Sequence, residues 1–127
     1  MIKERKLDHI GLAVTDLEAS KAWYCDVLGF EVIGHFFADD TPAYFLKNGD
    51  TVYEMYEEPI DEAVQGKIDH ISFVSEDIEA DYAYCKDQGY TICTNGIEGI
   101  PTFWEKGCRY FKLLTPTGEQ VEFCQIL

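Results

Sequence analysis

The chain has 127 residues, the length of one domain or of two small modules that share a core. Its 24 acidic and 10 basic side chains give a formal net charge of −14 at pH 7. A field of this sign repels nucleic-acid phosphates and anionic lipid headgroups, so the composition excludes both as expected partners.

The first half of the chain predicts one strand, one helix and three further strands. The helix follows an apolar, β-prone run, with Thr15 or Asp16 as its N-cap and Gly29 as its left-handed stop. Asn48-Gly49 is typical of the type I′ turn of a two-residue β-hairpin. The strands are expected at residues 7–14, 30–38, 43–47 and 51–57, with a turn at 39–42.

The second half predicts the same order of elements after a linker at 58–66, which contains Pro59 and closes with Gly66. A helix is expected over 77–88, stopped by Gly89. The strands are expected at 67–75, 90–94, 108–114 and 119–126, with a loop at 95–106 and a turn at 115–118.

The cysteines and the N-terminal residues indicate a cytoplasmic protein. The five cysteines are odd in number and form no C-x-x-C pair, which is typical of reduced thiols in the cytosol. No apolar run follows the charged residues 1–6, so we expect neither a signal peptide nor a membrane span.

An internal repeat organises the chain. Asp8-His9-Ile10 returns as Asp69-His70-Ile71, and Asp16-Leu17-Glu18-Ala19 returns as Asp77-Ile78-Glu79-Ala80, in both cases 61 residues later. Each half therefore reads β-α-β-β-β. We expect an α+β fold in which residues 1–127 form one domain. Its modules, 1–57 and 67–127, are joined by the linker 58–66.

The repeat gives each half one histidine on a strand face of small residues. Because alternate residues of a strand share a face, His9 lies with Gly11 and Ala13, while the large apolar residues between them take the other face. His70 lies with Ser72 and Val74 in the same way. We expect the helices to cover the large apolar faces and the histidine faces to line a cavity.

Two glutamates stand inside apolar strands, one in each half. Glu54 and Glu122 are costly in a core unless they are partnered or bind a metal. A lone strand histidine is more often a satisfied core or edge residue, and a lone strand glutamate more often faces solvent. Since the four residues occur as one pair per half, His9, Glu54, His70 and Glu122 predict a site for one divalent ion: Ni, Zn, Co, Mn or Fe.

Three further positions are candidates for substrate binding. Arg109 could hold a substrate carboxylate, or it could form a surface ion pair. Phe103 and Trp104, in the loop 95–106, could close over the site or pack beneath the loop. His35 is expected at the surface or at a sheet edge.

The paired modules and the segment Leu-Asp-His-Ile-Gly-Leu-Ala-Val-Thr-Asp-Leu-Glu-Ala-Ser, residues 7–20, resemble the vicinal oxygen chelate superfamily. This resemblance covers essentially the whole chain. It implies a cupped, incomplete mixed β-barrel with the helices outside, and a homodimer. Members place metal ligands on the first and fourth strands of each module, which implies the set His9, Glu54, His70 and Glu122.

The ligand set is similar to that of bacterial glyoxalase I, also called lactoylglutathione lyase. The resemblance thus implies a metal-dependent lyase of methylglyoxal detoxification. It would convert the hemithioacetal of a 2-oxoaldehyde and a thiol into a 2-hydroxyacyl thioester by proton transfer through a metal-bound enediolate. Glu122 would abstract the proton, and either Glu122 or Glu54 would return it to the neighbouring carbon. The alternatives are an epimerase or other isomerase of acyl thioesters, and a protein that binds a small molecule or metal without turnover.

Overall fold

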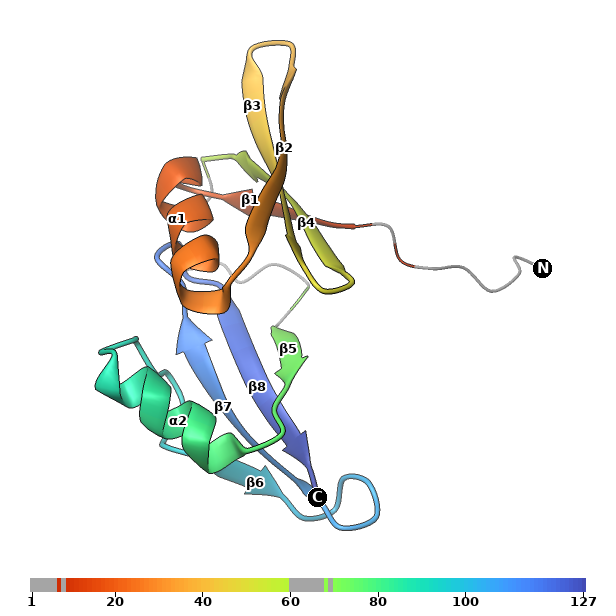
Figure 1. Ribbon diagram of the computed structural model, residues 1–127, viewed down its shortest axis with the longest axis vertical. Helices are drawn as coiled ribbons and strands as arrows, with labels where there is room; N and C mark the ends of the chain where they lie inside the picture. Colours follow the sequence, from red (N-terminus) through yellow and green to blue (C-terminus); the bar gives the residue numbers. More distant parts are fainter. Residues whose placement is uncertain (1–6, 8, 60–67, 69) are drawn as a thin grey trace, which may run out of the picture. The chain divides into compact units, whose positions relative to one another are not determined.

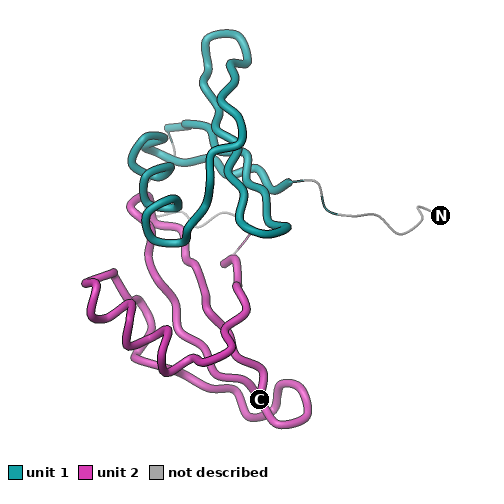
Figure 2. The backbone as a smooth tube through the Cα atoms, in the orientation of Figure 1, with its two compact units in different colours: residues 1–62 teal, residues 63–127 magenta. Residues whose placement is uncertain are grey.

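The computed structural model describes residues 7, 9–59, 68 and 70–127. The chain divides into two compact units, residues 1–62 and 63–127 (Figure 2). Most of the predicted linker, residues 60–66, lies outside the described residues. The module boundaries at 57 and 67 stay a prediction.

Unit 1 folds as one strand, one helix and three strands (Figure 1). Its sheet has the order β1-β4-β3-β2, in which β1 runs parallel to β4 and the other neighbours are antiparallel. The elements are β1 Ile10–Val14, α1 Leu17–Leu28, β2 Glu31–Ala38, β3 Thr41–Asn48 and β4 Thr51–Glu57.

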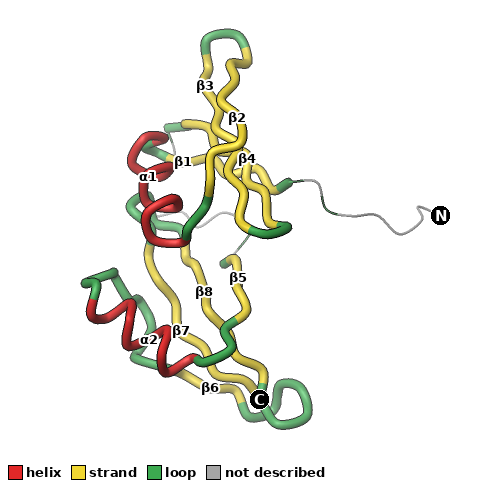
Figure 3. Tube along the Cα trace, viewed as in Figure 1, coloured by secondary structure: helices red, strands yellow, loops and turns green. Residues whose placement is uncertain are grey.

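Unit 2 repeats this plan. Its sheet has the order β5-β8-β7-β6, again with one parallel pair, β5 with β8 (Figure 3). The elements are β5 Ile71–Val74, α2 Ile78–Asp87, β6 Glu98–Ile100, β7 Cys108–Leu114 and β8 Gln120–Ile126. Two β-α-β-β-β modules in an α+β fold are therefore confirmed, and closure of the sheets into a barrel stays a prediction.

The repeated sequence builds the same helix start twice. The Asp16 carboxylate accepts a hydrogen bond from the Ala19 amide at 3.0 Å, and Asp77 accepts one from Ala80 at 3.1 Å. These N-caps satisfy amides that the first helical turn leaves unpaired. The end of α1 is also as predicted, because Gly29 adopts the left-handed conformation at φ 70°.

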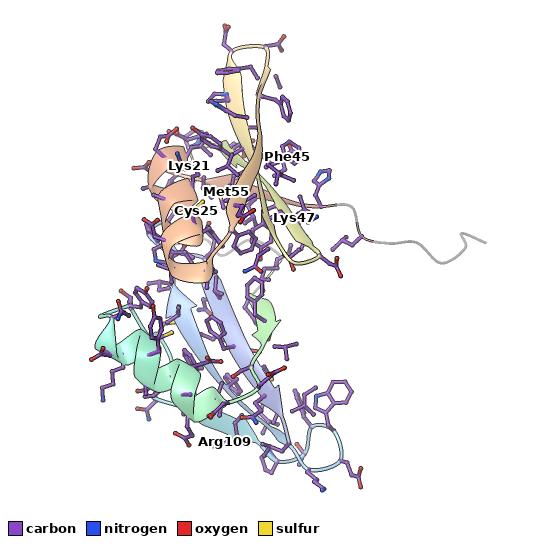
Figure 4. The ribbon with its side chains drawn as sticks, viewed as in Figure 1. Lys21, Cys25, Phe45, Lys47, Met55 and Arg109 are labelled. Atoms are coloured by element: carbon purple, nitrogen blue, oxygen red, sulfur yellow. The ribbon has the colours of Figure 1, made fainter. Side chains whose placement is uncertain are left out.

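The core of unit 1 lies between α1 and one face of its sheet. Tyr53 and Met55 are fully buried there, and Tyr24 of α1 meets Tyr53 edge-to-face at 5.5 Å. Figure 4 shows Met55 and Cys25 on this side of the sheet, and Phe45 and Lys47 on the side away from α1. Since paired strand residues share a face, Glu54, which pairs with Phe45, also lies on that second face.

The core of unit 2 has the same arrangement. Phe111, Leu113 and Val121 are buried, and the ring of Tyr82 on α2 meets Phe111 at 5.4 Å. The helices therefore cover one face of each sheet, as the strand alternation predicts. The glutamate of each sheet is left on the opposite face.

Three sequence predictions on the strands are wrong. Strand β1 begins at Ile10 rather than Leu7, because its pairing with β4 starts there, and β5 begins at Ile71. Residues 90–94 form no strand but one isolated bridge, Ile92 to Leu113. The strand of this region instead lies inside the predicted loop, as β6, because residues 98–100 are the ones that pair with β7.

The hairpin between β3 and β4 is also displaced from its prediction by one residue. Asn48 pairs with Thr51, so the two turn residues are Gly49 and Asp50. Gly49 has φ 57°, whereas Asp50 is not among the residues with positive φ. A type I′ turn requires positive φ at both central positions, so this turn is of another type.

Candidate functional site

Unit 1 brings His9 and Glu54 together. His9 immediately precedes β1, and Glu54 stands in the middle of β4 opposite Gly11. The His9 Nε2 atom lies 3.1 Å from the Glu54 Oε2 atom, and both side chains are about one-third exposed. We call this pair the unit 1 half-site.

Unit 2 brings His70 and Glu122 together at the equivalent positions. His70 immediately precedes β5, and Glu122 stands on β8 opposite Ser72. The His70 Nε2 atom lies 3.5 Å from the Glu122 Oε2 atom. We call this pair the unit 2 half-site. Each predicted histidine thus lies beside the predicted glutamate of its own module.

The unit 2 half-site holds its carboxylate more tightly. The Glu122 side chain is 12% exposed, against 33% for Glu54. The Ser72 hydroxyl donates to Glu122 Oε1 at 2.8 Å, so the two carboxylate oxygens have different neighbours. Gly11 occupies the position of Ser72 in unit 1 and has no hydroxyl to offer. The repeat is therefore symmetric in its His–Glu pairs and asymmetric around them.

The strand opposite each glutamate adds a neighbour that sequence reasoning missed. In unit 1, Phe45 pairs with Glu54, and its ring meets that of His9 at 5.5 Å. In unit 2, Lys112 pairs with Glu122. Strand period alone separates Lys112 from Arg109 by face, but its pairing with Glu122 depends on the register of β7 and β8.

Two other polar groups share the face of Glu122. Burial raises the pKa of the Tyr110 hydroxyl, and the charges of Glu98 and Glu122 act in the same direction. Burial, together with the Cys108 thiol, also raises the pKa of Cys124 to about 11. The Cys124 side chain is therefore a protonated thiol at neutral pH.

The weaker sequence candidates lie in other surroundings. Arg109 forms an ion pair with Glu79 of α2, with 2.5 Å between Nη2 and Oε1. The surface ion pair that the sequence left open is thus present, on the helix side of the sheet (Figure 4).

Phe103 and Trp104 are exposed, and Trp104 has φ 57° in the turn segment before β7. Their role as a lid stays a prediction. His35 is exposed on the edge strand β2 and stacks on Tyr44 at 4.3 Å.

The donor chemistry of the half-sites fits a divalent metal ion. Imidazole nitrogen and carboxylate oxygen are the ligands of Zn, Ni, Co and Mn. Each half-site brings one of each within 3.5 Å, at equivalent points of the fold. Within the described ranges, no cluster contains three or more His, Cys, Asp or Glu residues able to hold a metal. Among its described residues, each unit contributes two of the four donors predicted from the sequence.

Neither described helix is long and apolar enough to cross a membrane. The five cysteines, all within the described part of the chain, are free thiols.

Comparisons with known proteins agree on the family. Residues 6–123 match the Glyoxalase/Bleomycin resistance protein/Dioxygenase superfamily. The chain is 30% identical over 127 residues to the uncharacterized protein YwbC of Bacillus subtilis, covering 95% of this chain and 98% of that protein.

Solved structures share the fold at lower identity. A glyoxalase family protein from Enterococcus faecalis has a TM-score of 0.77 at 20% identity, with 94% of this chain and 97% of that chain covered. A lactoylglutathione lyase from Agrobacterium tumefaciens has a TM-score of 0.71 at 16% identity, with 97% and 95% covered. With the family match over nearly its whole length, this chain belongs to the Glyoxalase/Bleomycin resistance protein/Dioxygenase superfamily.

Proposed function

We propose that the protein is a metal-dependent lyase or isomerase of glyoxalase I type. The hypothesised substrate is the hemithioacetal that a 2-oxoaldehyde, such as methylglyoxal, forms with a thiol. The observation that carries the proposal is the repeated His–Glu pair, with nitrogen-to-oxygen distances of 3.1 Å and 3.5 Å in the two units.

Four side chains would hold the ion: His9, Glu54, His70 and Glu122. Two neutral imidazoles and two carboxylates balance the charge of a divalent cation. When bound, the metal would supply a Lewis acid that polarises the two adjacent oxygens of the substrate and acidifies the C–H bond between them.

Glu122 is the residue best suited to move the proton. Its carboxylate is mostly buried, and Ser72 fixes its orientation through Oε1. It would take the proton from the carbon that bears the sulfur and return it to the neighbouring carbon. The hydroxyl and carbonyl carbons exchange oxidation states, so the product is a 2-hydroxyacyl thioester. The reaction needs no external oxidant or reductant.

The supporting comparison is the lactoylglutathione lyase from Agrobacterium tumefaciens, which shares the fold. We extend its activity to this chain only as a proposal, because an identity of 16% supports a shared fold and not a shared activity. The identity of the thiol is not part of the proposal. The described arginine, Arg109, is paired with Glu79 rather than placed on the glutamate face of the sheet.

The test is an activity panel in deuterated water. Purified protein loaded in turn with Ni, Zn, Co or Mn is assayed with methylglyoxal and several thiols, and with racemisable acyl thioesters. We expect thioester formation from a hemithioacetal with at least one metal, and none after chelation. Deuterium exchange that occurs only with acyl thioesters would show that the protein is an epimerase and not a lyase. Absence of exchange on every substrate would indicate a binding protein.

A further inference from the structure

We propose that Phe45 is a positioning residue of the unit 1 half-site: its ring holds the His9 imidazole with the Nε2 atom toward Glu54. This inference rests on the proposed function, since His9 is one of the four side chains proposed to hold the metal. It adds a residue that acts through one of those side chains rather than on the metal itself.

The His9 side chain needs contacts from other strands to be held in one orientation. His9 immediately precedes β1, and its side chain is 35% exposed. A partly exposed histidine can occupy several rotamers, and a half turn of the ring exchanges the positions of its two nitrogens. A metal that binds through one particular nitrogen therefore binds more tightly when the ring is already held in place.

The Phe45 ring provides such a contact. The centres of the His9 and Phe45 rings lie 5.5 Å apart and their planes meet at 71°, the edge-to-face arrangement that aromatic rings favour. Phe45 and Glu54 are paired across β3 and β4, and Phe45 lies on the side of the sheet away from α1 (Figure 4). The ring and the carboxylate that contact His9 thus come from one level of the sheet, and together they restrain the imidazole.

A second ring supports Phe45 from β2. Phe45 pairs with Gly34 on that side, and the Phe36 ring lies 6.0 Å from the Phe45 ring at an angle of 67°. A Cβ atom added to Gly34 would lie 2.5 Å from the Phe36 Cε2 atom, so the Phe36 ring lies over this glycine. A side chain at position 34 would displace the ring, and the glycine therefore leaves room for Phe36 to reach Phe45.

These ring contacts are separate from the core of unit 1. Tyr44 and Leu46, which flank Phe45 in β3, are buried, and Phe45 takes the opposite face because strand residues alternate. The Phe36 side chain is 62% exposed. Packing of α1 on the sheet therefore does not explain why the two phenyl rings lie together beside His9.

The test replaces Phe45 by leucine, which keeps an apolar side chain and removes the ring. The first readout is the set of Hα–Hβ couplings of His9, measured by nuclear magnetic resonance on metal-free, full-length protein. We expect the couplings of one χ1 rotamer in wild-type protein and averaged couplings in Phe45→Leu. The second readout is the affinity for zinc alone, which should fall about three- to tenfold, the value of one aromatic contact. Phe45→Tyr keeps the ring and should restore both.

Two further variants are controls. Phe37→Leu removes an exposed phenyl ring from the other face of β2 and should change zinc affinity by less than about twofold. Gly34→Ala displaces the Phe36 ring but leaves Phe45 beside His9, so its loss of affinity should lie between those of the two leucine variants. Wild-type couplings or wild-type zinc affinity in Phe45→Leu would overturn the inference, as would an equal loss of affinity in Phe37→Leu.

The two proposals fail in different ways. If the protein is not a lyase, turnover will be absent on every hemithioacetal while zinc affinity still depends on the ring at position 45. If Phe45 does not position His9, the Phe45→Leu protein will keep wild-type couplings and zinc affinity while the turnover of hemithioacetals persists.

Discussion

The two half-sites have the same pair of residues in different surroundings. Glu54 pairs with Gly11 and Phe45 and is one-third exposed. Glu122 pairs with Ser72 and Lys112 and is mostly buried. The duplicated chain thus keeps its donor atoms at equivalent positions, while the residues on the neighbouring strands differ.

Under the proposed function, this difference predicts different roles for the two carboxylates. A carboxylate oriented by a hydroxyl and shielded from water is preorganised for proton transfer, because little rearrangement is needed when the proton moves. Glu54 has a more open position and suits the role of a ligand. Three comparisons between the units test this division, and a fourth tests the core of unit 1.

The largest effect is expected from the glutamates. Glu122→Gln should lower kcat by about 10²–10⁴-fold, the range of general acid–base catalysis, with a smaller loss of bound metal. Glu54→Gln should lower metal affinity and reduce kcat less once metal is saturating. Both are measured on metal-loaded, folded protein. Equal losses of kcat in the two variants would contradict the division of roles.

The next effect concerns metal content. His9→Ala and His70→Ala should each lower metal affinity by more than about tenfold, since even residues behind the ligands matter to that extent. Elemental analysis after dialysis gives the measurement. The control is His35→Ala, because His35 is exposed on β2 and stacks on Tyr44. Wild-type metal content in either variant would show that the replaced histidine is not a metal ligand.

A smaller effect is expected from the residues paired with the glutamates. Ser72→Ala removes the hydroxyl that donates to Glu122 and should lower kcat by about tenfold. The reciprocal variant, Gly11→Ser, tests whether unit 1 accepts the same hydroxyl. A Cβ there meets nothing nearer than Tyr56 at 3.9 Å, so the fold should tolerate it. A kcat unchanged in Ser72→Ala would show that the hydroxyl does not orient the base.

The smallest effect is expected on stability, from a change in the core of unit 1. Tyr53 of β4 is fully buried, and its hydroxyl has no hydrogen-bond partner among the described residues. Burying a hydroxyl without a hydrogen-bond partner is unfavourable. Tyr53→Phe removes that hydroxyl and should raise the free energy of unfolding by about 1 kcal/mol. Urea denaturation measures it. Tyr44→Phe is the contrast, since the Tyr44 hydroxyl donates to Glu18 at 2.8 Å and its loss should destabilise. A destabilised Tyr53→Phe would reveal a partner for the hydroxyl.

Local sequence was sufficient to predict the helices and to single out the residues of the two His–Glu pairs. Asp16 and Asp77 cap helices because a short carboxylate can reach an unpaired amide three residues on, an interaction within one turn. The repeat then identified His9 and His70, and the polar residue within each apolar strand identified Glu54 and Glu122. Each of these signals lies within a few residues of sequence or in the comparison of two copies.

Pairing between distant strands was decided only by the tertiary structure. It set the start of β1 at Ile10, the position of β6 at 98–100, and the lysine opposite Glu122. It also turned Arg109 toward α2. The two-residue period of a strand shows which of its residues share a face. The partner across the ladder depends on hydrogen bonds to segments far away in the chain. The sequence by itself therefore determined the two half-sites, and strand register determined the residues that surround them.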